Sequence, residues 1–499
     1  MIWSIRAMRC GIHSRQKGAF MAKWKIYLFG AGKKGCYWLR CLKSFGTVPE
    51  GFIDNNEAMQ GELCEGIPVY GVEKLIKTEF DYVLITCNDE EVIYHQLLCL
   101  GIVEHKIIAG YHKLKNYIFY YAINSHILAE GTLGYQLQCS VQQKILFDLQ
   151  NGMVLGGVEA WSYELAKQLK KQGMEGAYLT IDSALSAFVD KTYPAYIFRY
   201  YDCREERERI DLCVRVISEN LPCTVVCNFP QYIFWSACIA RTLYPNQVRI
   251  VAVQHNDDQS YYEAYSLWQN YIDRCIVISS RMKDKQLAYG MKNEKIMHIN
   301  WEVPCEMHLK RTWSREDVPL RIGYAGRVTV TQKRADLLLE TALQLVRKKI
   351  DFCLTIAGIG DYSEIMTQRI CADEMGSYVK TIGYIDRKEI SDFWKGQDIM
   401  ISCSEWEGHS ISQVEAMAAG AVPVITDVSG ARDDVINGYN GFVVPVGDIN
   451  DLVDKICFLY QNRAELEHMG RLAHDMICKR QENSNQAAFW DRLLKKVWE

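Results

Sequence analysis

Residues 407–415, EGHSISQVE, combine acidic and hydroxyl side chains at spacings that suit a phosphorylated ligand. Ser410 and Gln413 have the spacing of a capping box, which predicts that a helix begins directly after Ser410. The backbone N–H groups from Ile411 onward would then lack helical partners and would lie at the positive end of the helix dipole. Such a helix start is suited to bind a phosphate group.

Two glutamates of this run could bind hydroxyl groups. Glu415 is expected at the margin of an apolar stripe formed by Ile411, Val414 and Ala418, because each helical residue advances by about 100°. A carboxylate there needs partners: the two hydroxyls of a ribose could donate to it, or a neighbouring arginine or backbone group could. Glu407 precedes the helix and could contact the hydroxyls of a sugar, or be a solvated loop acid.

Two cations stand in a second loop, GRVTVTQK at residues 326–333. Arg327 and Lys333 could neutralise a diphosphate both when it is bound and when it departs, which is the work of a metal ion in other enzymes. A basic loop by itself is usually solvated, so this interpretation depends on its combination with Glu407 and Glu415. No convincing Asp-x-Asp pair supplies a metal site for such a ligand, and we expect none.

Both runs follow strands in a region that alternates regularly between strand and helix. Its expected strands are residues 321–325, 352–357, 378–382, 399–402, 422–425 and 442–444. Such alternation predicts a parallel, doubly wound sheet with its ligand crevice beyond the carboxyl ends of the strands.

An earlier block has expected strands at residues 144–149, 224–227, 249–253 and 274–278. Gly156 and Gly157 precede an expected helix over residues 158–171, and His255 follows a strand. Glycine pairs before helices are common in α/β proteins, and a lone histidine after a strand is more often structural, so these residues gain meaning only from their context.

The beginning of the chain contains a second possible nucleotide site. A strand over residues 25–30 leads into G-x-G-x-x-G, formed by Gly30, Gly32 and Gly35, and Asp54 ends the next expected strand, residues 52–54. This is the order expected of a nucleotide-binding βαβ unit. A scaffold or docking domain without a ligand would explain the same residues.

Several motifs occur in a fixed order over residues 321–455: Gly326-Arg327, a lysine at 333, Ala357-Gly358-Ile359-Gly360, EGHSISQVEAMAAG and Gly441-Phe442-Val443-Val444-Pro445. Together they closely resemble the carboxy-terminal half of retaining family 4 glycosyltransferases of the GT-B type. The resemblance implies two facing Rossmann-like domains, a nucleotide diphosphate sugar as donor, no further cofactor, and transfer with retention of configuration. Two departures occur: Gly408-His409-Ser410 replaces the family's Gly-Phe-Gly, and the Arg327–Lys333 spacing is one residue longer than usual.

The resemblance also implies residue roles. The implied catalytic set is Glu407, His255, Arg327 and Lys333. The implied donor-binding set is Gly156, Gly157, Gly326, Arg327, Lys333, Gly358, Glu407, His409, Ser410, Ile411 and Glu415. Arg327 and Lys333 would bind the diphosphate, Glu415 the ribose and Glu407 the donor sugar. A saccharide or lipid-linked saccharide acceptor is implied too, whereas the donor base and sugar are not.

These patterns divide the chain into an N-terminal extension (1–22), a small Rossmann-like domain (23–110), a connector (111–141), an acceptor-side domain (142–315), a donor-binding domain (316–480) and a C-terminal helix (481–499). Through GFIDNN and Gly66-Ile67-Pro68-Val69, the small domain resembles the domain that precedes bacterial sugar acetyltransferases and some polysaccharide-synthesis enzymes.

The charge balance and the cysteines indicate which classes of partner and of site the protein is expected to lack. The 499 residues carry 57 Lys and Arg against 61 Asp and Glu, a balance that does not suggest a nucleic-acid partner. The 19 cysteines are scattered through apolar segments, which is typical of free thiols in a reducing compartment. Cys223 and Cys227 lack the further ligands that would complete a zinc site.

The sequence also bears on location. The first residues contain no uninterrupted apolar run of the secretory type, and the longest apolar stretch, residues 229–244, is too short to span a membrane. We expect a cytoplasmic protein with at most peripheral contact at the inner membrane. Lys167, Lys170 and Lys171 could provide that contact, or form an ordinary solvated helix face.

Two other functions stay open. An NAD-dependent oxidoreductase or epimerase would be centred on Gly30 to Asp54, and bound nicotinamide cofactor would reveal it. A non-catalytic protein of a polysaccharide assembly complex would bind a nucleotide sugar or a partner without turnover, although the joint presence of the acidic and basic site residues disfavours it.

Overall fold

The computed structural model describes residues 24–124, 143–153, 156–181, 190–373, 375–482 and 485–499. The expected N-terminal extension and residues 125–141 of the expected connector lie outside the described residues. The chain forms two compact units. The first comprises residues up to 253, 259–274 and 498, and the second comprises residues 254–258, 275–497 and 499.

The first unit begins with a sheet in the order β3-β4-β2-β1-β5-β6, parallel except for the antiparallel β3–β4 pair. Strands β1, β2, β5 and β6 are short apolar runs between turns, and their side chains contribute to a buried core with the covering helices. The strands are β1 (Ile26–Phe29), β2 (Gly51–Ile53), β3 (Leu63–Cys64), β4 (Ile67–Tyr70), β5 (Tyr82–Ile85) and β6 (Ile107–Ile108). The helices are α1 (Lys33–Ser44), α2 (Glu73–Lys77), α3 (Glu90–Cys99) and α4 (Tyr111–Asn124).

A second sheet follows in the same unit, with parallel strands in the order β11-β10-β7-β8-β9. The chain first adds β8 and β9 on one side of β7 and then adds β10 and β11 on the other side. The topological switch point of this sheet therefore lies between β7 and β10. The strands are β7 (Lys144–Leu149), β8 (Glu175–Ile181), β9 (Ala195–Phe198), β10 (Cys223–Cys227) and β11 (Val248–Gln254). The helices are α5 (Gly157–Lys171), α6 (Glu206–Ser218), α7 (Tyr232–Leu243) and α8 (Gln259–Leu267).

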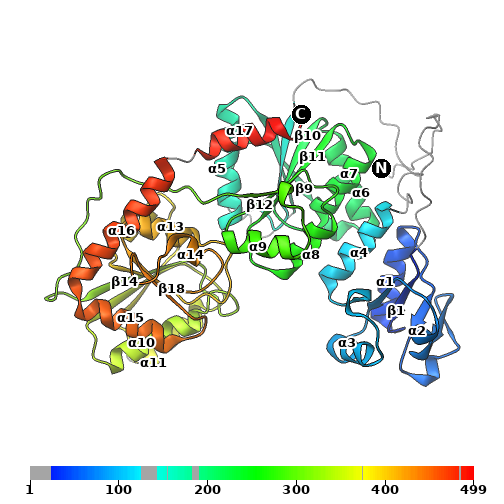
Figure 1. Ribbon diagram of the computed structural model, residues 1–499, viewed down its shortest axis with the longest axis horizontal. Helices are drawn as coiled ribbons and strands as arrows, with labels where there is room; N and C mark the ends of the chain where they lie inside the picture. The colour runs from blue at the N-terminus through cyan, green and yellow to red at the C-terminus, as the bar shows by residue number, and fades with distance from the viewer. Residues whose placement is uncertain (1–23, 125–142, 154–155, 182–189, 374, 483–484) are drawn as a thin grey trace. The chain divides into compact units, whose positions relative to one another are not determined.

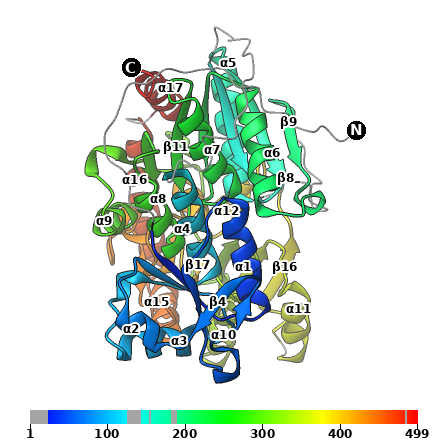
Figure 2. The same cartoon turned by 90° about the vertical axis from the view of Figure 1, so that its right-hand side faces the viewer.

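Helix α4 joins the two sheets of the first unit by packing against α7 and α8 (Figure 2). Its Lys115 is buried and donates to both carboxylate oxygens of Glu206 on α6, each at 3.1 Å. The hydroxyls of Tyr37 and Tyr232 donate to the same carboxylate at 2.5 and 2.6 Å. Because Tyr37 belongs to α1, this network links α1, α4, α6 and α7.

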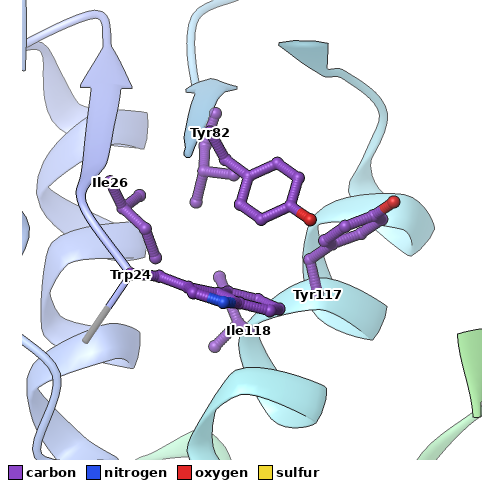
Figure 3. Close-up of a pocket in the computed structure, with 6 residues that line it drawn as sticks. Trp24, Ile26, Tyr82, Tyr117 and Ile118 are labelled. Atoms are coloured by element: carbon purple, nitrogen blue, oxygen red, sulfur yellow. The ribbon is translucent and has the colours of Figure 1, made fainter. Parts of the chain in front are cut away.

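A small apolar pocket lies at the same joint, where β1 and β5 meet α4 (Figure 3). The ring centroids of Trp24 and Tyr82 are 4.9 Å apart, and those of Tyr82 and Tyr117 are 5.2 Å apart. The lining is completed by Ile26, Leu84 and Ile118. Since no charged group lines it, we interpret this pocket as part of the packing at the joint.

The second unit contains a parallel sheet in the order β16-β15-β14-β17-β18-β19, with its switch point between β14 and β17. Helices α13, α14 and α16 cover one face, and α10, α11 and α15 cover the other (Figure 1). The strands are β14 (Leu320–Ala325), β15 (Phe352–Ala357), β16 (Val379–Gly383), β17 (Ile399–Ser402), β18 (Val422–Thr426) and β19 (Phe442–Val444). The helices are α10 (Ala335–Arg347), α11 (Ser363–Ala372), α12 (Ile390–Lys395), α13 (Ile411–Ala418), α14 (Ala431–Asp434), α15 (Ile449–Gln461), α16 (Arg463–Glu482) and α17 (Gln486–Lys496). Ahead of this sheet the chain forms β12 (Arg274–Val277), α9 (Ser280–Ala288) and β13 (Ile296–His298).

The expected α/β architecture of parallel, Rossmann-like sheets is confirmed. The strands expected from the sequence all occur, with ends shifted by one or two residues at most. The sequence patterns did not mark β8 and β9.

The expectation that the cysteines are free thiols is wrong for one pair. Cys305, in the segment after β13, forms a disulfide with Cys478 on α16, across 173 residues of sequence. No local pattern signals such a pair, because only the folded chain brings the two sulfurs together. The other cysteines of the described residues are free thiols, many of them buried, and burial raises the pKa of Cys275 to about 12.

Candidate functional site

The loops after β14 and β17 meet at the switch point of the second unit's sheet. The amide of Gln332 donates to the Trp406 carbonyl oxygen at 3.1 Å, joining the two loops. The hydroxyl of Ser412, in the first turn of α13, donates to the Ala325 carbonyl oxygen at the end of β14, at 2.8 Å. The fold therefore brings the basic loop and the acidic run together where open α/β sheets bind ligands.

Charged side chains from the two loops pair within this site. Lys333 forms an ion pair with Glu407, which is buried and also accepts a 2.8 Å hydrogen bond from the Ser404 hydroxyl. The guanidinium of Arg327 donates to the side-chain oxygen of Gln332. Both cations are therefore already oriented, so an entering anion meets donors that need little reorganisation.

Glycine lets the loops after β14 and β15 approach closely. A Cβ on Gly358 would lie 1.8 Å from the carbonyl oxygen of Gly326, and Gly358 has a φ of +144°. Contact and conformation both exclude a side chain at this position. The backbones of the two loops are consequently in direct contact at Gly326 and Gly358.

The capping box expected at the start of α13 is wrong. Ser410 is the N-cap residue, but its side chain makes no capping hydrogen bond. The buried side chain of Gln413 donates instead to the carboxylate of Asp434, at 3.0 Å. Within the described chain no protein acceptor takes the N–H groups of Ile411 and Ser412, so this helix start is available to an anion.

His409 anchors its loop through a buried side chain. Its Nδ1 lies 3.0 Å from the Ile278 carbonyl oxygen and its Nε2 lies 2.6 Å from an Asp434 oxygen. Both neighbours are oxygen atoms, so the ring is held between the Ile278 backbone and the Asp434 side chain. Burial alone would raise the pKa of Asp434, but the ion pairs with His409 and Arg480 hold it below its usual range. Any contact of His409 with a donor would therefore come from its backbone.

Glu415 lies half-buried on α13, near Trp394 and Arg387. Burial raises the pKa of its carboxyl to about 7, and the positive charge of Arg387 opposes this shift only in part. The arginine considered from the sequence is thus present, yet it does not restore an ordinary pKa. A carboxylate in such surroundings suits a ligand that brings hydroxyl groups.

Replacing Glu415 by glutamine should stabilise the protein at alkaline pH. The carboxyl titrates at 4.5 in its unperturbed state and at about 7 when folded, so its ionisation opposes folding above about pH 7, and this cost disappears as the pH falls toward 4.5. Thermal unfolding at about pH 8 and about pH 5 measures the effect, and we expect a higher Tm for Glu415→Gln mainly at the higher pH. Exposed Glu316 gives the control Glu316→Gln, and a gain independent of pH would contradict the assignment.

His255 lies in the second unit beside the loop that carries Glu407. A Cβ on Gly408 would lie 2.2 Å from the His255 carbonyl oxygen. The His255 ring stacks on Trp301, with 6.0 Å between centroids, and the Trp301 indole donates to the His409 carbonyl oxygen at 2.8 Å. Burial lowers the pKa of His255 to about 3, so this imidazole is neutral and can form hydrogen bonds without carrying charge.

The glycine pair assigned to the acceptor side lies in the first unit, at the start of α5. Nothing surrounds the position of a Cβ on Gly157, whereas a Cβ on Gly156 would lie 2.1 Å from an oxygen of Glu159. Gly157 thus presents open backbone, and a contact of this pair with a donor stays a prediction.

Asp148 is an acid of the first unit that the sequence analysis missed. It is the penultimate residue of β7 and accepts hydrogen bonds from the N–H groups of Gln150, Asn228 and Phe229 at 3.0, 3.2 and 3.1 Å. These bonds tie the end of β7 to the loop after β10, at the switch point. Burial raises the pKa of Asp148 to about 7.

The glycine motif of the first sheet folds as a close turn, but its acid is already engaged. A Cβ on Gly35 would lie 1.9 Å from the Gly30 carbonyl oxygen, and Gly32 is the N-cap residue of α1. The carboxylate of Asp54 accepts a 2.8 Å hydrogen bond from the Ala31 N–H in the same turn. A ribose would compete with that backbone donor, and nucleotide binding here stays a prediction.

Residues considered for membrane contact make local interactions. Lys167 forms an ion pair with Asp190 at 3.4 Å, and Lys170 donates to the Thr192 carbonyl oxygen. Among the described residues, no helix has the length and apolar character needed to cross a membrane.

Three family models match separate parts of the chain. Residues 310–476 match Glycosyl transferases group 1, residues 155–301 match Glycosyltransferase Family 4, and residues 22–108 match C2185-like, N-terminal. The first two matches show that residues 155–301 and 310–476 are each similar to a glycosyltransferase family.

Similar proteins of known name share part of their length with this chain. The poly(ribitol-phosphate) alpha-N-acetylglucosaminyltransferase of Staphylococcus aureus (strain COL) is 28% identical over 176 residues, 35% of this chain and 35% of that protein. The amylovoran biosynthesis glycosyltransferase AmsK of Erwinia amylovora is 26% identical over 195 residues, 38% of this chain and 48% of that protein. The matches thus span about a third to a half of these relatives.

Solved structures confirm the GT-B fold. S. aureus TarM, in a complex that contains UDP, has a TM-score of 0.58 and 15% identity, covering 71% of this chain and 99% of its own. Anabaena HepE, in complex with UDP and glucose, has a TM-score of 0.56 and 18% identity, covering 67% of this chain and 95% of its own. The additional Rossmann-like sheet formed by β1 to β6 precedes this fold.

Proposed function

We propose that this protein is a glycosyltransferase that moves a sugar from a nucleotide diphosphate donor to a saccharide or lipid-linked saccharide, in the synthesis of cell-surface polysaccharide or glycolipid. One observation carries the proposal: two oriented cations, Arg327 and Lys333, share a switch point with an available helix start and the half-buried carboxylate of Glu415. Cations and amides suit a diphosphate, and a carboxylate suits a ribose. The UDP in the TarM and HepE complexes favours a UDP-sugar.

The mechanism depends on stabilising the departing diphosphate. As the bond between C1 of the sugar and the diphosphate oxygen lengthens, negative charge grows on the phosphate. Arg327, Lys333 and the amides at the start of α13 stabilise this charge without a metal ion. Glu407, held by Lys333 and Ser404, accepts hydrogen bonds from the donor sugar, and the neutral His255 supports the neighbouring loop or the sugar.

A thermal-shift screen tests the donor. Saturating UDP-sugar should raise the Tm, since ligand at a hundred times its Kd stabilises a protein by about 2.7 kcal/mol. GDP- and ADP-sugars should give smaller shifts, and Glu415→Ala should reduce the UDP-sugar shift. No shift with any nucleotide sugar, together with a shift and absorbance from NAD, would favour an oxidoreductase instead. Binding without turnover over a broad acceptor panel would favour an assembly protein.

The reaction itself should retain configuration and need no divalent metal. Proton NMR of the new linkage should show the anomer of the donor, and an inverted product would contradict the family 4 mechanism. Adding magnesium or manganese to protein treated with a chelator should leave turnover unchanged, because Arg327 and Lys333 supply the charge. Turnover that appears only with manganese would contradict this role.

We further propose that the protein acts in the cytoplasm, with peripheral contact at the inner membrane where lipid-linked acceptors are assembled. The first sheet resembles the domain that precedes sugar acetyltransferases, and we assign it a docking or nucleotide-binding role. Its engaged Asp54 favours docking.

A further inference from the structure

Two sulfurs and one imidazole lie together in the second unit. The ligand atoms of Cys305, His474 and Cys478 all lie within 4.8 Å of one another. His474 and Cys478 are one turn apart on α16, and Cys305 comes from the segment after β13. Thiolates with an imidazole are the ligands that Zn²⁺ prefers. We propose that these three side chains form a zinc site when the Cys305–Cys478 disulfide is reduced.

The hydrogen bonding of His474 determines which of its nitrogens can bind a metal. The ring is buried, and Nδ1 lies 2.6 Å from the Ala418 carbonyl oxygen, which can only accept. Nδ1 therefore carries the hydrogen of the neutral ring, and the lone pair is on Nε2, 3.5 Å from the Cys478 Sγ. Metal-binding histidines donate their other N–H to a carbonyl group in this way.

The disulfide does not satisfy this lone pair, because a bonded sulfur has no hydrogen to donate. Among the described residues no other donor to Nε2 of His474 occurs. A buried polar atom without a partner costs free energy, and a cation would remove that cost. Glu306, the neighbouring acid, already accepts from Lys395 at 2.7 Å, so water is the fourth ligand expected.

A phosphine reductant and water convert the disulfide to two thiols, while the phosphine becomes its oxide. Zn²⁺ then displaces the two thiol protons and forms two sulfur–zinc bonds and one nitrogen–zinc bond. The two thiolates neutralise the ion. Through Ala418, the site also connects α16 to the last turn of α13.

Cobalt(II) substitution in the reduced, full-length protein tests the site. We expect stoichiometric Co²⁺ binding with a thiolate-to-cobalt charge-transfer band that added Zn²⁺ removes. Cys305→Ser and Cys478→Ser should abolish the band, whereas Cys371→Ser, at an exposed free cysteine of the same unit, should keep it. No band in the reduced wild-type protein, or an unchanged band in Cys305→Ser, would overturn the proposal.

A second measurement needs no variant. In the reduced wild-type protein, Zn²⁺ should slow the alkylation of Cys305 and Cys478 by iodoacetamide about tenfold or more. Mass spectrometry measures the alkylation rate of each cysteine. Alkylation of Cys371 in the same sample should not change. Equal rates at Cys305 and Cys478 with and without Zn²⁺ would also overturn the proposal.

Discussion

Arg327→Ala should lower kcat at saturating donor by about a hundredfold, because losing one contact to the leaving group costs roughly 3 kcal/mol in the transition state. Arg327 is oriented by Gln332 in the loop after β14, so its removal leaves Lys333 and the start of α13 in place. Steady-state transfer assays with a UDP-sugar measure the effect. The loss should appear in kcat, since the contact strengthens as charge grows on the phosphate.

The matched control is Arg347→Ala, at an exposed arginine of α10 whose side chain is 67% accessible. This variant should retain the wild-type kcat. An Arg327→Ala enzyme with unchanged kcat would remove Arg327 from the mechanism. An equal loss in both variants would indicate a general effect of charge.

Glu206→Ala should destabilise the first unit by about 3–5 kcal/mol, the usual cost of removing one partner of a buried ion pair. The side chains of Lys115 and Glu206 are 2% and 4% exposed, so the lysine would be left charged in a dry environment. The hydroxyls of Tyr37 and Tyr232 would lose their acceptor as well. Lys115→Met should cost less, because Glu206 keeps the two tyrosines and an ion pair with Arg209 at 3.1 Å.

Urea unfolding followed by tryptophan fluorescence measures these free energies. Glu164→Ala, at an exposed acid of α5, is the control and should change stability little. If Glu206→Ala cost no more than Glu164→Ala, the network would not hold the joint together. If Lys115→Met cost more than Glu206→Ala, the carboxylate would not be its centre.

Local patterns predicted most of the fold because a buried parallel strand is a short apolar run, as in β7 and β15. Strand β9 was not predicted because only one of its four side chains, Phe198, is buried, so the run lacks a buried pattern. The disulfide was not predicted for a different reason. Cys305 and Cys478 are far apart in the sequence, and no local motif relates them.

The sequence predicted which loops form the candidate site. The hydrogen-bond partners of the individual side chains became clear only from the structure. Motif order led to Arg327, Lys333 and Glu415, which occur on the loops and helix of one switch point. The prediction of a capping box was wrong because the spacing of Ser410 and Gln413 gives no information about Asp434. The Gln413 side chain donates to Asp434 instead. The family pattern likewise could not indicate that His409 would turn inward to the same carboxylate.

The packing of helix α4 against α7 matters when the chain is shortened to the part that matches glycosyltransferases. Its Asn116 accepts a 2.7 Å hydrogen bond from the Trp235 indole, and the Phe119 ring lies 4.7 Å from that indole between centroids. A protein starting at residue 143 would bare this aromatic face of α7 to water and invite aggregation. The domain boundary suggested by family resemblance therefore divides a hydrophobic core. The N-terminal domain should be kept together with the domain that follows it.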